Sequence, residues 1–120
     1  MATILIVDDT ASMRQMIGFT LNDASYEVTE AADGNEALEA ARKSKFDAVI
    51  TDINMPNMDG IALVRELRSL AEYKFTPILM LTTESQDSKR KESKEAGATG
   101  WIVKPFNPEQ LLNVIKNVLN

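Results

Sequence analysis

The sequence predicts an α/β domain with a doubly wound, five-stranded parallel sheet. Three observations predict it: five short apolar segments typical of buried strands, segments of helical periodicity between them, and a length of 120 residues that suits one hydrophobic core. Strand and helix signals that alternate in this way favour parallel strands with helices on both faces of the sheet. Residues 1–120 are therefore expected to form one domain.

The first strand and helix are predicted from the amino-terminal residues. Thr3–Val7 reads Thr-Ile-Leu-Ile-Val, which is typical of a buried strand, and it is followed by Asp8 and Asp9. Thr10 or Ser12 is expected to cap the next helix. The apolar positions of this helix recur at helical spacing and predict its buried face, which consists of Met13, Met16, Ile17, Leu21 and Ala24.

The second strand and helix have equally local signals. Residues 26–31 alternate between apolar and polar side chains, a pattern typical of an edge strand. Asp33 and Glu36 have the spacing of a capping box. The second helix is therefore expected to begin after Asp33 and to end near Lys43.

The third strand leads to the residue on which the functional argument depends. Apolar residues 48–50 predict a buried strand that ends on Asp52, and Pro56 stops regular structure soon after it. Asp59 is expected to cap the next helix, whose apolar stripe consists of Leu63, Val64, Leu67 and Leu70. Asp52 is thereby placed at the carboxyl edge of the sheet, where open α/β sheets bind their ligands.

The fourth strand and helix differ in character. Pro77 precedes an apolar strand, residues 78–81, which leads to Thr82 and Thr83. Residues 85–95 contain helix formers but no large apolar side chain, so this helix is expected to pack loosely. Its charged surface is either a solvated face or a surface for a partner.

The fifth strand and helix complete the pattern. Residues 101–103 predict a strand that ends at Lys104 and Pro105. Asn107 and Gln110 have the spacing of a capping box and predict the start of the last helix. The buried face of that helix is expected to consist of Leu111, Leu112, Ile115, Val118 and Leu119.

Charge and composition limit the classes of function. The formal net charge of −5 argues against direct nucleic-acid binding, because such binding requires Lys and Arg to neutralise phosphates. The chain contains no cysteine and no histidine, which excludes disulfides, the usual zinc sites and imidazole catalysis. A bound metal would need oxygen ligands, which favours Mg²⁺, Mn²⁺ or Ca²⁺. The sequence contains no recognisable secretory signal or membrane-spanning run, so a cytoplasmic protein without membrane insertion is expected.

Polar residues at the predicted strand ends form a candidate site. The carboxyl ends of parallel strands meet at one edge of the sheet. The residues placed there are Asp8, Asp9, Asp52, Thr82 and Lys104. Crowded carboxylates repel one another, and a divalent cation would relieve that repulsion. Aspartate is an established nucleophile toward phosphoryl groups, so Asp52 is the candidate acceptor, with Thr82 and Lys104 beside the phosphoryl oxygens.

Four short motifs stand at these strand ends. They are Ile6-Val7-Asp8-Asp9, Thr51-Asp52-Ile53-Asn54-Met55-Pro56 with Met58-Asp59-Gly60, Leu81-Thr82-Thr83-Glu84, and Val103-Lys104-Pro105-Phe106. In this order and spacing they resemble the receiver domains of two-component response regulators, most closely the single-domain chemotaxis (CheY-like) type. The resemblance covers essentially the whole chain and implies a flavodoxin-like (βα)5 fold with strand order 2-1-3-4-5.

The resemblance implies a role in phosphoryl transfer. Asp52 would accept a phosphoryl group from a histidine kinase in a reaction that needs Mg²⁺, with Mn²⁺ as a substitute. The implied metal ligands are Asp8, Asp9, Asp52 and Asn54, the last through its backbone carbonyl. Thr82 and Lys104 would contact the acyl phosphate, and the bond between Lys104 and Pro105 resembles the cis peptide of the family.

The family also implies a conformational switch. It pairs the hydroxyl at the position of Thr82 with an aromatic residue at the position of Trp101. Trp101 replaces the tyrosine of the best-known chemotaxis members, and a packing role fits it as well as a switch role. The helix at residues 85–95 is more charged than the surface associated with flagellar-motor binding. Asn54 and Glu84 are the pair typical of chemotaxis members and favour a short-lived phosphoryl group.

The sequence therefore favours a signalling module rather than an enzyme, with output by phosphorylation-dependent protein binding, in chemotaxis. Expected partners are the kinase, a downstream target such as the flagellar switch, and a phosphatase, and the chain is expected to be a monomer. One alternative function is that of a phosphorelay intermediate. Another is a Mg²⁺-dependent phosphohydrolase with an aspartyl-phosphate intermediate, although enzymes of that class would have a second acidic residue at the position of Asn54. A third alternative is a receiver used only as a scaffold.

Overall fold

The computed structural model describes residues 2–83 and 87–119, and it confirms the predicted α/β architecture. Strands and helices alternate along the chain, with one short 3-10 helix before the fourth strand. The elements are β1 (Thr3–Val7), α1 (Ala11–Asp23), β2 (Glu27–Ala31), α2 (Gly34–Lys43), β3 (Ala48–Asp52), α3 (Gly60–Arg68), η1 (Ala71–Tyr73), β4 (Ile78–Thr83), α4 (Asp87–Ala96), β5 (Gly100–Lys104) and α5 (Pro108–Leu119). None of the described helices has both the length and the apolar character needed to cross a membrane.

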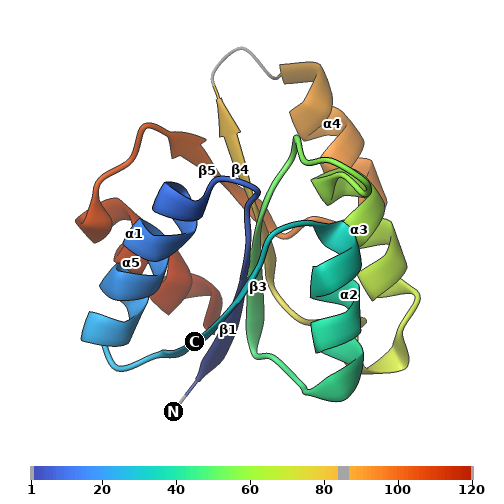
Figure 1. Cartoon of the computed structure of the whole chain (residues 1–120). Coiled ribbons are helices and arrows are strands. Elements are labelled where there is room, and N and C mark those ends of the chain that lie inside the picture. Colours follow the sequence, from blue (N-terminus) through green and yellow to red (C-terminus); the bar gives the residue numbers. More distant parts are fainter. Residues whose placement is uncertain (1, 84–86, 120) are drawn as a thin grey trace.

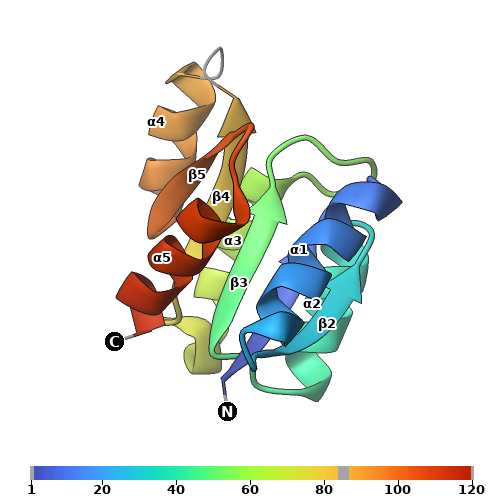
Figure 2. The ribbon, with the colours of Figure 1, turned by 90° about the vertical axis from the view of Figure 1, so that its left-hand side faces the viewer.

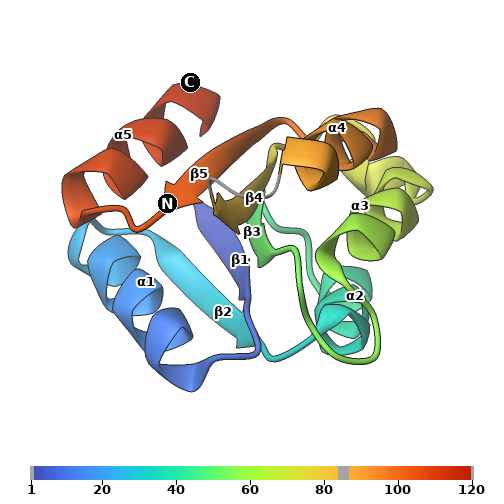
Figure 3. The same ribbon diagram turned by 90° about the horizontal axis from the view of Figure 1, so that it is seen from above.

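The sheet lies between two layers of helices (Figure 1). Neighbouring strands all pair in parallel, in the order β2-β1-β3-β4-β5, which confirms the predicted order and the position of β2 at an edge. The helices α1 and α5 cover the face that Figure 2 turns toward the viewer, and α2, α3 and α4 cover the other face. Figure 3 looks down on the carboxyl ends of the strands, with one layer of helices on each side.

Side chains that alternate along the strands form two separate hydrophobic cores. Leu5, Val49 and Met80 belong to the core under α2 and α3. Ile4 and Ile50 belong to the core under α1 and α5. Because both faces of the sheet are covered, β1, β3 and β4 have continuous apolar runs, whereas the edge strand β2 alternates.

Three helices begin with the predicted capping chemistry. The carboxylate of Asp33 accepts the backbone N–H three residues later at 2.9 Å, and that of Asp59 does the same at 2.8 Å. Before α5, Asn107 and Gln110 exchange the two reciprocal hydrogen bonds of a capping box. Each cap satisfies backbone donors that have no partner inside the helix.

The start of α1 differs from the prediction. Thr10 occupies the position before the helix, but its side chain makes no capping hydrogen bond within residues 2–83 and 87–119, and Ser12 lies inside the helix. The backbone N–H of Thr10 instead donates to the carboxylate of Asp8 at 2.8 Å. A side chain at the end of β1 therefore organises this turn.

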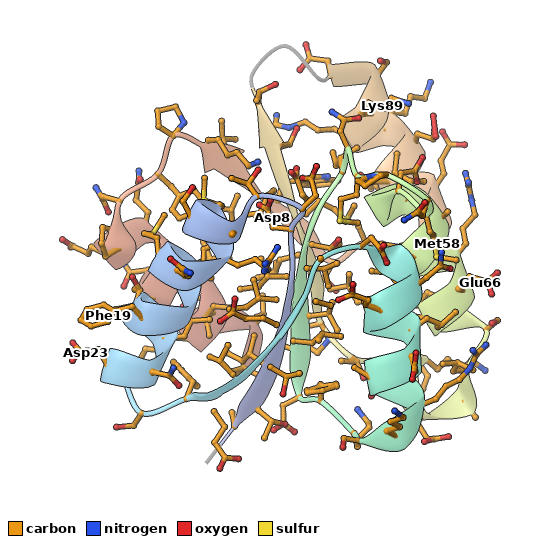
Figure 4. The ribbon with its side chains drawn as sticks, in the orientation of Figure 1. Asp8, Phe19, Asp23, Met58, Glu66 and Lys89 are labelled. Carbon is orange, nitrogen blue, oxygen red and sulfur yellow. The ribbon has the colours of Figure 1, made fainter. Side chains whose placement is uncertain are left out.

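The predicted buried face of α1 is also too wide. Ile17 and Leu21 are buried, but Met16 is 37% exposed and Ala24 is exposed as well. The helix contacts β1, β2 and α5 along a narrow stripe, which leaves these two positions outside it. Phe19, at 75% exposure, projects away from the domain (Figure 4).

The segment between α3 and β4 contains η1, which was not predicted from the sequence. Tyr73 at its end is fully buried. The guanidinium group of Arg68 donates to the backbone carbonyls of Tyr73 and Thr76, each at 2.7 Å, and to that of Gly97 at 3.0 Å. Arg68 thereby ties the carboxyl end of α4 to the segment that leads into β4.

The helix α4 is held by few buried contacts, as predicted. Ser93 is its only buried residue in the described part of the chain. Gly97 ends the helix with φ 115°, and the N–H of Ala98 donates to the carbonyl of Ser93 at 3.0 Å. The predicted start at residue 85 and the expectation for Glu84 lie outside the described residues.

We expect the backbone amides of α4 to exchange with solvent faster than those of α1, α3 and α5, because α4 buries no large apolar side chain. Hydrogen exchange followed by mass spectrometry measures the protection of each helix. The helix α5 is the matched control, since it has a similar length but buries Leu111 and Ile115. Equal protection across the four helices would contradict this expectation.

Candidate functional site

Three carboxylates meet at the carboxyl edge of the sheet. The strands β1 and β3 are neighbours, with Val7 opposite Thr51. Asp8 and Asp9 directly follow β1, and Asp52 is the last residue of β3. One oxygen atom from each carboxylate lies within 4.8 Å of the other two. Figure 4 labels Asp8 at this edge of the sheet. The parallel register alone therefore brings together the acids that the sequence pattern singles out.

Asp8 is the most deeply buried of the three, with 0% exposure. Its Oδ1 accepts the N–H of Thr10 at 2.8 Å, whereas its buried Oδ2 has no hydrogen-bond partner among the described residues. Burial raises the pKa of Asp8, and the N–H of Thr10 partly opposes that shift. The charges of Asp52 and Asp9 raise the pKa further, while Lys104 lowers it. When all three carboxylates are ionised, the positive charge of Lys104 does not balance their negative charge.

Lys104 brings a positive charge to this cluster. It ends β5, two strands away from β3, and its peptide bond to Pro105 is cis, as the family resemblance implies. Its Nζ lies 3.2 Å from Oδ1 of Asp52, and the two side chains are 23% and 14% exposed. The same oxygen accepts the backbone N–H of Ile53 at 2.9 Å. Two donors therefore fix the orientation of the Asp52 carboxylate.

The donor set fits a hard divalent cation. Carboxylate oxygens are the ligands that Mg²⁺ prefers, and Mg²⁺ keeps several coordination positions for water or phosphate oxygens. Within residues 2–83 and 87–119, Oδ2 of Asp8 has no hydrogen-bond partner, and it is a buried acceptor of the kind that a cation would satisfy. Asn54 lies exposed two residues beyond Asp52, and its backbone carbonyl as a ligand stays a prediction.

Thr82 and Trp101 lie on one side of two adjacent strands. The hydroxyl of Thr82 is fully buried at the end of β4 and donates to the carbonyl of Thr83 at 3.2 Å. The register pairs Met80 with Trp101 and Thr82 with Val103. Met80 and Trp101 both contact the core under α2 and α3, and side chains two residues apart share a face, so Thr82 is on the same side as Trp101.

Trp101 has a polar partner that was not predicted from the sequence. Its indole N–H donates to Oγ of Ser93 at 2.8 Å, and the Ser93 hydroxyl donates to the carbonyl of Arg90 at 2.8 Å. Ser93 is 0% exposed. The available signal was a serine one turn before Gly97 in an otherwise charged helix. Trp101, the aromatic residue of the predicted switch, is thus hydrogen-bonded directly to α4.

Two further residues that were not assigned to the site from the sequence support its backbone. Gly60 begins α3 so close to Asp52 that any Cβ atom at position 60 would collide with the Asp52 carbonyl. Arg14 donates to the carbonyl of Asp8 at 2.6 Å and pairs with Glu30 at 3.3 Å. A glycine directly after the helix cap Asp59 was a sequence signal for the close approach at Gly60. The contacts of Arg14 had no such signal, because they depend on how α1 packs against the sheet.

Known proteins resemble this chain along nearly its whole length. The sequence profile described as response regulator receiver domain matches residues 4–116. The structure of the chemotaxis response regulator CheY4 of Vibrio cholerae is 57% identical, with a TM-score of 0.95 and coverage of 99% of both chains. The receiver domain of a sensor histidine kinase of Pseudomonas aeruginosa, solved with a magnesium ion coordinated in its active-site cleft, is 29% identical, with a TM-score of 0.91 and coverage of 98% of this chain and 97% of that one.

The curated relatives are longer proteins. The transcriptional regulatory protein SrrA of Staphylococcus aureus is 40% identical over 116 residues, which make up 97% of this chain and 47% of the relative. The chain therefore spans about half the length of the curated relatives it matches.

We expect Asp8→Asn to raise the melting temperature of the metal-free protein at neutral pH, because it removes a charge that burial and two neighbouring carboxylates disfavour. A relief of about 1 kcal/mol corresponds to a rise of roughly 4 °C in a domain of this size. The gain should shrink as the pH falls toward the raised pKa of Asp8, where the wild-type residue also becomes neutral. Thermal unfolding in a chelator, followed by circular dichroism at several pH values, measures it.

Asp9→Asn is the matched control, because Asp9 is exposed and its substitution should change the melting temperature less. Added Mg²⁺ should stabilise the wild type more than Asp8→Asn, since a bound ion stabilises the folded state that holds its ligands. Identical melting temperatures of wild type and Asp8→Asn in the chelator would show that the buried charge carries no such cost.

Proposed function

The chain belongs to the family of response regulator receiver domains, the signalling domains of two-component systems, and we propose that it is a phosphorylation-controlled switch with Asp52 as its phosphoacceptor. The observation that carries the proposal is the contact between Lys104 and Asp52 beside two further carboxylates. This arrangement supports an oriented, partly exposed nucleophile next to a cation. A histidine kinase would supply the phosphoryl group, since the chain contains no histidine of its own.

Phosphoryl transfer begins with Asp52 as the nucleophile. One carboxylate oxygen attacks the phosphorus of a phosphohistidine on the kinase, the P–N bond breaks as the P–O bond forms, and the imidazole leaves with the electron pair. The ammonium group of Lys104 then stabilises the charge on the phosphoryl oxygens, and Thr82 is the candidate hydroxyl donor. The existing 3.2 Å contact between Lys104 and Asp52 supports this role, because the cation is already in place before transfer.

The residues that would hold Mg²⁺, or Mn²⁺ in its place, are Asp8, Asp9, Asp52 and the Asn54 carbonyl. When bound, a divalent cation neutralises part of the charge on the transferring group. The chain's own part is to gather the ligands at one edge and to orient the Asp52 carboxylate through the N–H of Ile53. The buried, partnerless Oδ2 of Asp8 within the described residues supports this assignment.

The proposed output is contact with a downstream protein, controlled through Trp101 and α4. Thr82 and Trp101 share one side of adjacent strands, and Trp101 is bonded to Ser93 of α4. A displacement of Thr82 that moves Trp101 would reach α4 through the hydrogen bond from Trp101 to Ser93. Such a response is a shift between two populated states, limited by how differently the phosphoryl group interacts with each.

Chemotaxis is the pathway that we favour, because a similar structure from Vibrio cholerae is that of a chemotaxis response regulator, and this chain covers 99% of it. In this role the chain would act as a cytoplasmic monomer, bind a target such as the flagellar switch when phosphorylated, and be reset by hydrolysis or by a phosphatase. The surface of α4 is more charged than the surface associated with flagellar-motor binding. A phosphorelay intermediate is therefore the second candidate. The two roles differ in what receives the signal: a bound protein in the first, a further histidine in the second.

We expect the wild-type protein to gain the mass of one phosphoryl group when it is incubated with Mg²⁺ and a small acyl-phosphate donor. Asp52→Asn should gain none, because the amide is not a nucleophile under these conditions. Intact-mass spectrometry measures the adduct, and a parallel incubation with chelator tests the need for the metal. A folded wild-type protein that gains no mass, and whose Trp101 fluorescence does not respond to beryllofluoride with Mg²⁺, would support a scaffold role instead.

We expect Ser93→Ala to reduce the change in Trp101 fluorescence that beryllofluoride and Mg²⁺ produce, because the indole N–H has then lost its acceptor on α4. The free energy of unfolding should also fall by about 1 kcal/mol, the usual net contribution of a hydrogen bond, because the partly buried indole N–H loses its acceptor. Emission spectra and chemical denaturation measure the two effects. Ser88→Ala is the matched control, since Ser88 is an exposed serine of the same helix. A fluorescence response equal to that of the wild type would contradict the role of Ser93.

A further inference from the structure

The loop that follows the phosphoacceptor, residues 53–60, is fastened to the amino end of α2. The side-chain amide of Asn57 donates to Oδ2 of Asp33 at 2.9 Å. Beside this bond, the N–H of Gly34 donates to the carbonyl of Met58 at 3.3 Å. A Cβ atom at Gly34 would lie 2.7 Å from Cγ of Met58, so only glycine permits this approach. Figure 4 labels Met58 beside α2 and α3.

Asp33 divides its two carboxylate oxygens between two tasks. Its Oδ1 caps α2 by accepting the N–H of Glu36 at 2.9 Å, and its Oδ2 accepts from Asn57. The N–H of Glu36 and, next, the amide of Asn57 hold the pKa of Asp33 below its usual value. The link between helix and loop is therefore a hydrogen bond to a charged group, which is stronger than one between neutral groups.

The residue that Asp33 holds has an uncommon backbone conformation. Asn57 adopts φ 69°, in the left-handed region that is rare outside glycine and that asparagine enters more readily than most other residues. The N–H of Met58 donates to the carbonyl of Pro56 at 2.7 Å, which closes a three-residue turn around Asn57. Tight turns with a positive φ at their centre are rare and persist where surrounding contacts impose them. The hydrogen bond from Asp33 is such a contact.

The two ends of the loop meet beside the phosphoacceptor. The N–H of Gly60 donates to the carbonyl of Ile53 at 2.8 Å, and Gly60 packs against the backbone of Asp52. Asn54 therefore lies between this closed base and the tip that Asp33 holds. With both points fixed, the backbone of residues 54–56 has little freedom to move away from the carboxylates.

We propose that Asp33 and Asn57 are positioning residues of the metal site: their hydrogen bond holds residues 53–60 in the conformation that binds Mg²⁺. This inference rests on the proposed function, because it concerns the same cluster of Asp8, Asp9 and Asp52. Neither residue belongs to the cluster of carboxylates that would hold the ion. They act through the loop that carries the Asn54 carbonyl.

Two single variants remove the hydrogen bond between Asn57 and Asp33 while keeping the turn at residue 57 and the cap of α2. Asn57→Gly removes the donor but still permits a positive φ, and Asp33→Ser removes the second acceptor oxygen but keeps a residue that caps helices well. Each should weaken Mg²⁺ binding by about 10-fold, the low end of the effect of residues that orient metal ligands. The double variant should bind no more weakly than either single one, because both remove the same contact. Calorimetric titration of the full chain with MgCl₂ measures the affinity.

An exchange of the two residues tests the hydrogen bond itself. Asp33→Asn combined with Asn57→Asp conserves the net charge and reverses the direction of the bond, while position 33 keeps an oxygen that can cap α2. This variant should recover Mg²⁺ affinity to within about 2-fold of the wild type, as expected when one interaction is restored. Asn117→Gly in α5 is the control for stability, because it weakens a helix far from the loop and should leave Mg²⁺ affinity unchanged.

Each outcome decides the inference. Weaker Mg²⁺ binding by both single variants, recovered by the exchange, supports it. Wild-type affinity in both single variants, even with lower melting temperatures, would show that the link serves stability alone and would overturn it while leaving the proposed function intact. A wild-type chain that binds no Mg²⁺ would overturn the inference and the proposed metal-dependent function together.

Discussion

Repulsion between carboxylates at the carboxyl edge of the sheet is the constraint on which the rest of the site depends. One oxygen atom from each of Asp8, Asp9 and Asp52 lies within 4.8 Å of the other two, because β1 and β3 are neighbours that end at the same edge, and Asp8 is fully buried there. Two hydrophobic cores hold that register, so the chain cannot relieve the repulsion by moving a strand. Lys104 offsets only part of it, since an ion pair that is partly open to solvent contributes little. A cation bound by these oxygens is the completion that this charge distribution favours.

Local patterns made most of the fold predictable. Buried parallel strands leave continuous apolar runs, and capping boxes leave paired residues at fixed spacing, so the strands and three helix starts could be read from the chain. The errors lie where tertiary contacts compete with local ones. Thr10 does not cap α1 because its backbone is engaged by Asp8, and Met16 is exposed because α1 contacts the sheet along a narrow stripe. The short helix before β4 left no periodic signal because it spans a single turn.

The positions of the candidate site residues, like the strands that carry them, were predictable from local sequence patterns. Residues at strand ends are placed by topology: the alternation of strands and helices predicts that Asp8, Asp52 and Lys104 lie at one edge of the sheet, and the strand order implied by the family resemblance brings them close together. The contacts that hold them were not predictable, because they join segments far apart in sequence or depend on strand register. Asn57 and Asp33 are 24 residues apart, and the bond between Trp101 and Ser93 exists only because β5 lies beneath α4. The supporting contacts, rather than the candidate site residues themselves, are what the structure adds.

The hydrogen bonds of Arg68 hold α4 at one end only. This side chain fixes the carboxyl end of the helix, at Gly97, to the body of the domain, while Ser93 is the only fully buried residue of the described helix. A helix of 10 residues is about 15 Å long, so a tilt of about 10° around the fixed end would carry the other end through roughly 2–3 Å. With the carboxyl end held in this way, a small displacement near Ser93 would become a larger displacement at the amino end of α4, which lies toward the carboxyl edge of the sheet (Figure 1).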